Sequence, residues 1–128
     1  MNIERIKSDL VMRDLYFPEC SVKRESEITS EQLNIDISKD ITPKSDAEYD
    51  VTVTVCIDKP HKDLEVKVVA RATFTFAHSD PKLVAEIIRS NTVAIMFPFI
   101  RSQVSLLTTQ PGLTPIILPP INTAKLKD

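Results

Sequence analysis

The sequence predicts an α+β fold, in which a four-stranded antiparallel sheet is followed by a long helix that packs on it. Strand-like alternation of apolar and polar residues dominates the first 77 positions, and apolar residues recur at helical spacing after His78. The 128 residues include one glycine, so longer loops, not tight two-residue hairpins, should join the strands. We expect one domain over 1–128, with the sheet in 1–77, helical structure in 80–110 and an extended tail in 111–128.

The first two strands are predicted on either side of a long polar stretch. Residues 10–17 (LVMRDLYF) are rich in β-forming residues, and Pro18 is expected to end that strand. Residues 18–30 are polar and predict an irregular crossing loop. The second strand is indicated around 33–37, where Leu, Ile and Ile alternate with Asn and Asp. Residues 40–46 then predict a loop.

The third and fourth strands have the clearest alternation. Residues 49–57 (YDVTVTVCI) place valines on one face and polar residues on the other. Residues 58–62 (DKPHK) are typical of a turn. Residues 64–77 continue the same alternation over a longer strand. Four such strands with one apolar face predict an antiparallel sheet that is covered on that face.

A helix is predicted to begin at Asp80 and Pro81, as N-cap and first helical residue. Weak helix formers at 90–92 predict an interruption, followed by a second helical stretch over 94–109. Pro98 within that stretch indicates either a break before Met96 or a bend.

The end of this helix is predicted near Pro111, where Gly112 suits a C-terminal cap. Residues 113–121 (LTPIILPPI) are apolar and rich in proline, so we expect them to be extended. Residues 123–128 are expected to form a short polar tail.

The last third of the chain is almost uncharged. Between positions 90 and 124, Arg101 is the only charged residue. A helix on the surface of a monomer usually has a charged outer face. We therefore expect this helix to lie between its own sheet and a second subunit in a homo-oligomer, with direct contact to a bound peptide as the alternative. The residues expected at that interface are Phe97, Phe99, Ile100, Val104 and Leu107.

Nothing in the sequence predicts catalysis, a metal or a cofactor. His61 and His78 have no convergent partners in the pattern, and Cys20 and Cys56 are far apart without metal-ligand spacing. A single glycine excludes a nucleophile elbow and a phosphate-binding loop. We therefore expect a protein that is not an enzyme.

Charge and hydropathy limit the classes of partner that the sequence predicts. The net charge is −2, and basic residues are scattered, so nucleic-acid binding is not predicted. Fifteen of the 18 acidic residues lie in 1–65, which indicates either a solvated acidic face or a docking face for a basic partner. The N-terminus has no secretory signal and the longest apolar run is 93–100, so we expect a cytoplasmic chain without membrane insertion.

Two motifs stand out in the last third of the chain: residues 96–101 read MFPFIR, and residues 118–122 read LPPIN. Both resemble segments of the SecB preprotein chaperone family. In that family, an aromatic-Pro-aromatic-x-Arg segment opens the main helix, and a Leu-x-Pro-Val/Ile-Asn segment closes the loop that follows. Four antiparallel strands with a long first crossover also agree, and the resemblance is sharpest over 91–122.

The resemblance implies a chaperone of the holdase type, which binds non-native polypeptides or preproteins for export and assembles as a dimer or a dimer of dimers (a homotetramer). Its client grooves correspond here to residues 16–30 and 113–121. The implied client-binding residues are Tyr16, Phe17, Val22, Leu113, Ile116, Ile117 and Leu118.

The printed sequence departs from the family pattern after Asn122. Thr123 stands where the family has an aromatic residue, and the family's second helix and acidic tail are lacking. The resemblance implies the translocation motor SecA as a further partner, and the acidic tail is the segment that helps to recruit it in the family. Two alternatives stay open: an interaction protein dedicated to one partner, such as a toxin–antitoxin system, and a structural relative that binds no client.

Overall fold

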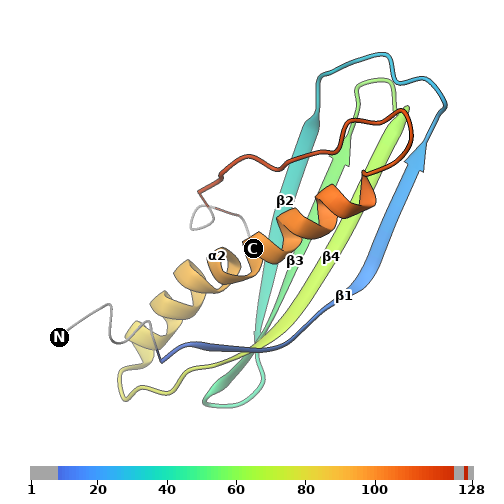
Figure 1. Ribbon diagram of the computed structural model, residues 1–128. Coiled ribbons are helices and arrows are strands. Elements are labelled where there is room, and N and C mark those ends of the chain that lie inside the picture. Colours follow the sequence, from blue (N-terminus) through green and yellow to red (C-terminus); the bar gives the residue numbers. More distant parts are fainter. Residues whose placement is uncertain (1–8, 123–125, 127–128) are drawn as a thin grey trace.

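Alternating side chains build a four-stranded antiparallel sheet with one long helix across one face (Figure 1). The computed structural model describes residues 9–122 and 126. In chain order the elements are β1 (Val11–Arg24), β2 (Asn34–Pro43), β3 (Glu48–Asp58), β4 (Leu64–Thr75) and α2 (Pro81–Leu107). The predicted α+β class and antiparallel sheet are confirmed.

The strand order in the sheet is β1-β4-β3-β2. Strands β1 and β2 are therefore opposite edges, although they follow one another in the chain. Residues 25–33, here called the crossover loop, pass from one edge of the sheet to the other (Figure 1). Residues 44–47 and 59–63 join the other strands, in line with the expectation that tight two-residue turns are not used.

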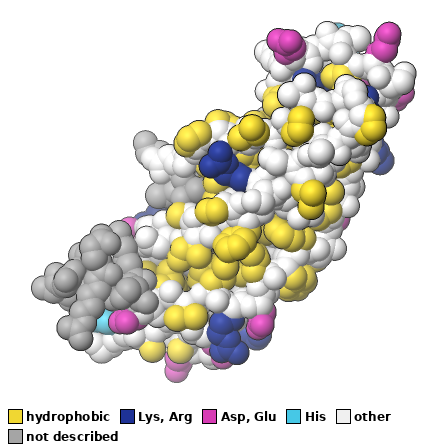
Figure 2. Space-filling model, viewed as in Figure 1, with side chains coloured by type: hydrophobic (Ala, Val, Ile, Leu, Met, Phe, Trp, Pro, Cys, Tyr) yellow, Lys and Arg dark blue, Asp and Glu magenta, His cyan; other side chains and the backbone are white. Residues whose placement is uncertain are grey.

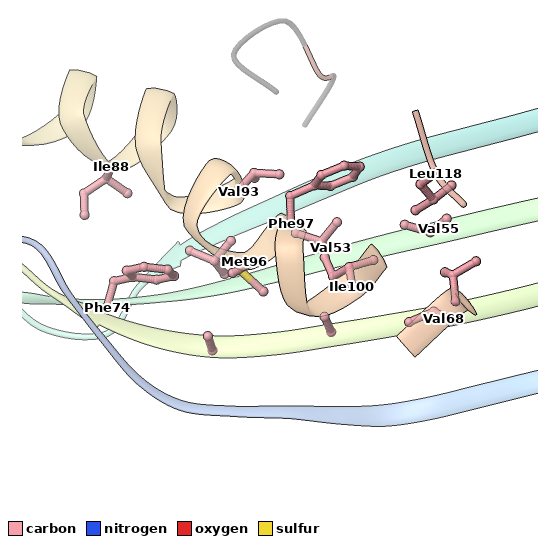
Figure 3. Close-up of a cluster of buried hydrophobic side chains, with 14 of the residues drawn as sticks. Val53, Val55, Val68, Phe74, Ile88, Val93, Met96, Phe97, Ile100 and Leu118 are labelled. Carbon is pink, nitrogen blue, oxygen red and sulfur yellow. The ribbon is translucent and has the colours of Figure 1, made fainter. Parts of the chain in front are cut away.

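The hydrophobic core lies between α2 and the inner face of β3 and β4. Every second residue along these strands is buried, from Val51 to Ile57 and from Leu64 to Phe74. Figure 3 shows Ile88, Met96 and Ile100 of α2 pointing at this face. A sheet with one covered face explains why β3 and β4 had the clearest alternation in the sequence.

Both edge strands are longer than predicted. Strand β1 does not end at Pro18 but continues to Arg24. Its pairing with β4 is irregular between Tyr16 and Glu19, so Pro18 lies in an irregularity of an edge strand, where a missing N–H is tolerated. Strand β2 continues through the predicted loop to Pro43, which pairs with Tyr49.

The helix begins as predicted, because the Asp80 side chain accepts a hydrogen bond from the Lys82 N–H at 3.0 Å. The predicted interruption at 90–92 is wrong, since α2 is continuous from Pro81 to Leu107. Asn91 and Thr92 donate from their side chains to carbonyls one turn earlier, at 3.0 and 2.7 Å, and Thr92 is fully buried. Tertiary packing here outweighs weak helix propensity.

The helix also passes through Pro98 without a break, so the predicted break before Met96 is wrong. Pro98 is on the exposed side of α2, where water can bond the carbonyl that proline leaves free. By length and composition alone, α2 would be able to cross a membrane, but 44% of its most apolar window is buried inside the protein. Such burial is typical of a core helix in a folded domain.

The helix ends at Leu107 with Thr108 as its C-cap, and Gly112 is not the cap. Gly112 has φ +74° within a turn that is closed by a hydrogen bond from the Leu113 N–H to the Gln110 carbonyl, at 3.1 Å. Residues 113–121, here called the return segment, are extended as predicted and run back over the sheet (Figure 1). Most of the predicted polar tail at 123–128 lies outside the described residues.

Candidate functional site

Three parts of the chain meet at one end of the sheet: the crossover loop, the 59–63 turn and the return segment (Figure 1). They enclose an opening of about 400 Å³, here called the crossover groove, which is within the usual size range of ligand pockets. Its apolar lining comes from Ile28, Leu33, Leu64, Leu113, Ile116 and Ile117. Its polar lining includes Ser30, Glu31, Lys59 and Thr114.

The crossover loop is held on the 59–63 turn by Asp63, which is only 7% exposed. One carboxylate oxygen of Asp63 accepts hydrogen bonds from the Thr29 N–H at 2.9 Å and from the Thr29 hydroxyl at 3.0 Å. The Asp63 carbonyl accepts a third bond, from the Glu25 N–H at 2.9 Å. The Thr29 N–H lowers the pKa of Asp63, because it bonds the charged carboxylate.

The return segment is held on the end of α2 by two hydroxyl side chains. The Ile116 N–H donates to the Thr108 hydroxyl at 2.9 Å, and the Ser105 hydroxyl donates to the Ile116 carbonyl at 2.9 Å. Arg24, at the end of β1, donates to the Pro111 carbonyl at 3.2 Å. Both walls of the crossover groove are therefore fixed by hydrogen bonds, which keeps the opening formed without a ligand.

The return segment also borders two further hollows. One, of about 540 Å³, lies along the outer side of α2 near Pro98 and Leu106. The other, of about 430 Å³, lies between Ile35 and Ile37 of β2 and Pro119. Ile117, which is 70% exposed, borders both the first of these hollows and the crossover groove. The return segment therefore borders three separate hollows of the described surface.

The structure separates the residues that the sequence predicted for client binding. Leu113, Ile116 and Ile117 line the crossover groove. Leu118 is fully buried beside Val55 (Figure 3) and borders the hollow at β2. Its side chain belongs mainly to the core.

The three predicted residues of β1 do not line the crossover groove. Tyr16 accepts a hydrogen bond from Arg71 at 3.3 Å, which places it on the face of the sheet opposite α2. Phe17 and Val22 are half-buried against the core. Val22 was expected in a loop, but residues 18–24 continue β1, and the crossover loop begins only at Glu25.

Sequence reasoning missed Leu33, Leu64 and Lys59 in this lining, and it covered Ile28 only through the range 16–30 without naming it. Ile28 gave a signal, since it is a lone apolar residue in a polar loop. Lys59 gave none, because a lysine in a turn is ordinary on the basis of sequence.

The residues predicted for a subunit interface also fall on two sides of α2. Phe97, Ile100 and Val104 are buried against the chain's own sheet, so their side chains are not open to a second subunit. Leu107 is half-buried, and Phe99 is 48% exposed on the outer side. Leu106, 68% exposed and seven residues from Phe99, shares that outer side and was not predicted.

Hydrophobic side chains extend along the helix-bearing face of the molecule, and most charged side chains on this face lie toward its two ends (Figure 2). Within the part of the chain that the structure describes, no group of three or more His, Cys, Asp or Glu side chains could hold a metal ion.

Comparisons with known proteins agree with this arrangement. The family model of the preprotein translocase subunit SecB matches residues 6–127. The fold is similar to a Mycobacterium tuberculosis SecB-like chaperone, Rv1957, solved in complex with a ChAD peptide from the Rv1956 HigA1 antitoxin. The TM-score is 0.69, with 14% identity over 91% of this chain and 90% of that one.

Two further similarities are weaker. A Streptococcus agalactiae protein of unknown function has a TM-score of 0.50, with 7% identity over 86% of this chain and 96% of that one. An uncharacterized protein of Methanocaldococcus jannaschii is 50% identical over 34 residues, which are 27% of this chain and 22% of that protein. The match of the family model to nearly the whole sequence is decisive: the chain belongs to the SecB family.

Proposed function

We propose that this chain is a holdase subunit whose crossover groove binds apolar segments of non-native polypeptides. Family membership supports a chaperone role. The observation that carries the proposal is the crossover groove itself, an opening of about 400 Å³ with a mixed apolar and polar lining, between two walls that are fixed by hydrogen bonds. Neither binding nor release by this mechanism requires an enzymatic step or a cofactor.

The energetics of such binding are moderate. A client segment that buries about 300 Å² of apolar surface gains roughly 7 kcal/mol at about 25 cal/mol per Å². Loss of translational freedom and ordering of the segment consume much of this gain. Weak binding at one groove becomes effective when several grooves on one assembly hold the same chain.

The proposal includes a homo-oligomer, either a dimer or a dimer of dimers. The outer side of α2 supports it, because Phe99 and Leu106 are exposed there and Arg101 is the only charged residue beyond position 90 of that helix. Cytoplasmic preproteins are the first client class to test.

A second candidate function is the binding of one dedicated partner, such as an antitoxin. It is favoured by the fold similarity to a SecB-like chaperone that was solved with an antitoxin peptide. A single stoichiometric partner, recovered with the tagged chain from its own cells, would distinguish this function from general holding.

The test of the proposed function is suppression of client aggregation. The purified chain should delay light scattering from a chemically unfolded, diluted client protein. Ile117→Asp should weaken this effect, because it places a charge in the crossover groove at a residue that is too exposed to matter for the fold.

The matched control is Val11→Asp, which also replaces an exposed apolar residue. Val11 is the first residue of β1, whereas the crossover groove lies near the other end of that strand, at Arg24. It should leave suppression unchanged. No delay of aggregation by the wild-type chain with any client, or equal loss in both variants, would contradict the proposal.

A further inference from the structure

The crossover groove contains a buried cation. Lys59 is only 9% exposed. Its ammonium donates a hydrogen bond at 2.6 Å to the carbonyl of Ser30, and both residues line the groove. Lysine is almost never buried without a partner of opposite charge. Among the described residues, however, no ion pair involves Lys59.

The acidic groups nearby do not serve as that partner. Asp63 belongs to the same turn, but among the described residues it forms no ion pair with Lys59: one of its carboxylate oxygens is bonded to Thr29, and the other is buried without a hydrogen-bond partner. Glu31 lines the groove but is exposed, so water and salt screen its charge. An ammonium has three N–H donors, and one of them is used by Ser30. Lys59 therefore has donor capacity to spare beside an apolar surface.

We propose that Lys59 makes the crossover groove selective for apolar segments that carry a carboxylate. This inference rests on the proposed function and adds a chemical preference to it. The apolar side chains of the segment pack against Leu113, Ile116 and Ile117, and a carboxylate next to them accepts hydrogen bonds from the Lys59 ammonium. The low dielectric of the groove strengthens this charged bond relative to the same bond in water.

A role for Lys59 as a tether of the crossover loop is the competing explanation. Asp63 already holds that loop at Thr29, the residue next to Ser30, so the loop does not depend on Lys59 alone. If Lys59 only held the loop in place, the groove would bind acidic and neutral peptides equally well. The two roles therefore differ in a measurable way, since only the proposed role distinguishes acidic from neutral clients.

The experiment compares three fluorescently labelled peptides of the same leucine- and isoleucine-rich sequence. The first has a central Glu and an amidated C-terminus, the second has Gln in its place, and the third has Gln with a free C-terminal carboxylate. Dissociation constants are measured by fluorescence anisotropy with the full chain. We expect the first peptide to bind about tenfold more tightly than the second, as is typical of a hydrogen bond between charged groups. If the third peptide alone binds tightly, the carboxylate recognised is the terminal one.

Variants assign the preference to Lys59. Lys59→Met should lower the affinity for the Glu peptide to that for the Gln peptide and leave the latter unchanged, whereas Lys59→Arg should retain the preference. Lys82→Met, at the exposed start of α2, is the control and should change neither value.

The failures are distinguishable. If the wild-type chain binds none of the peptides, the proposed function fails and the preference falls with it. If it binds all three equally, client binding stands and the role of Lys59 is refuted. The wild-type comparison decides this even if Lys59→Met does not fold. Equal weakening of the Glu and Gln peptides in a folded Lys59→Met variant would show that Lys59 is a tether only.

Discussion

Replacement of Thr108 by valine tests how the return segment is held. Thr108 is fully buried, and its hydroxyl accepts from the Ile116 N–H at 2.9 Å while donating to the Val104 carbonyl at 2.8 Å. Valine has nearly the same shape but leaves the Ile116 N–H buried without a partner. An unpaired buried donor costs about 1–3 kcal/mol.

This loss should appear as a lower free energy of unfolding in urea titrations followed by far-ultraviolet circular dichroism. In thermal unfolding of a chain of this length, each kcal/mol lost corresponds to a fall in Tm of roughly 3–6 °C. Thr108→Ser keeps the hydroxyl and should recover most of the loss. Hydrogen exchange of the Ile116 amide should accelerate in Thr108→Val well beyond exchange in the strands, because the return segment opens first. Stability within about 0.5 kcal/mol of wild type would refute the view that Thr108 fixes this wall of the crossover groove.

Three further predictions concern the core, the crossover loop and the outer side of α2. Ile100→Ala should reduce the free energy of unfolding by about 2–5 kcal/mol in urea titrations, since the Ile100 side chain is fully buried between α2 and the sheet; a small loss would contradict its placement. The folded pKa of Asp63 is lowered, so its ionised form stabilises the fold above the unfolded pKa of about 3.9, and this contribution disappears as pH falls through the lower folded value. The difference in urea midpoint between wild type and Asp63→Asn should therefore be largest near neutral pH and narrow at acid pH; a constant difference would mean that charge plays no part. Leu106→Glu should reduce the mass measured by sedimentation without lowering stability, whereas a wild-type chain that is monomeric at all concentrations would remove the basis for an interface there.

Much of the fold was predictable because β3 and β4 have one dry face and one wet face. Their alternation in the sequence follows directly from that environment. The edge strands were underestimated because Pro18 and Pro43 end strands in the middle of a sheet but are tolerated at its edges. The continuous helix was missed because the burial of Thr92, a tertiary effect, overrides its local propensity.

The site was only half predictable for a similar reason. Leu113, Ile116 and Ile117 stood out as apolar residues in an uncharged extended segment. Tyr16 and Phe17 were assigned to the site because the family resemblance placed a client groove at residues 16–30, whereas residues 16–24 here belong to β1. The burial of Lys59 depends on where the crossover loop lies over the 59–63 turn, and no local pattern encodes that position.

The path of the crossover loop has a consequence for how this protein can diversify. The loop joins two strands that never pair with one another, so its length is not coupled to any strand register. Residues can be added to it or removed from it at little cost to the sheet, since surface loops accept such changes readily. The width of the opening, and with it the range of polypeptides admitted, is then adjustable while the scaffold beneath stays the same.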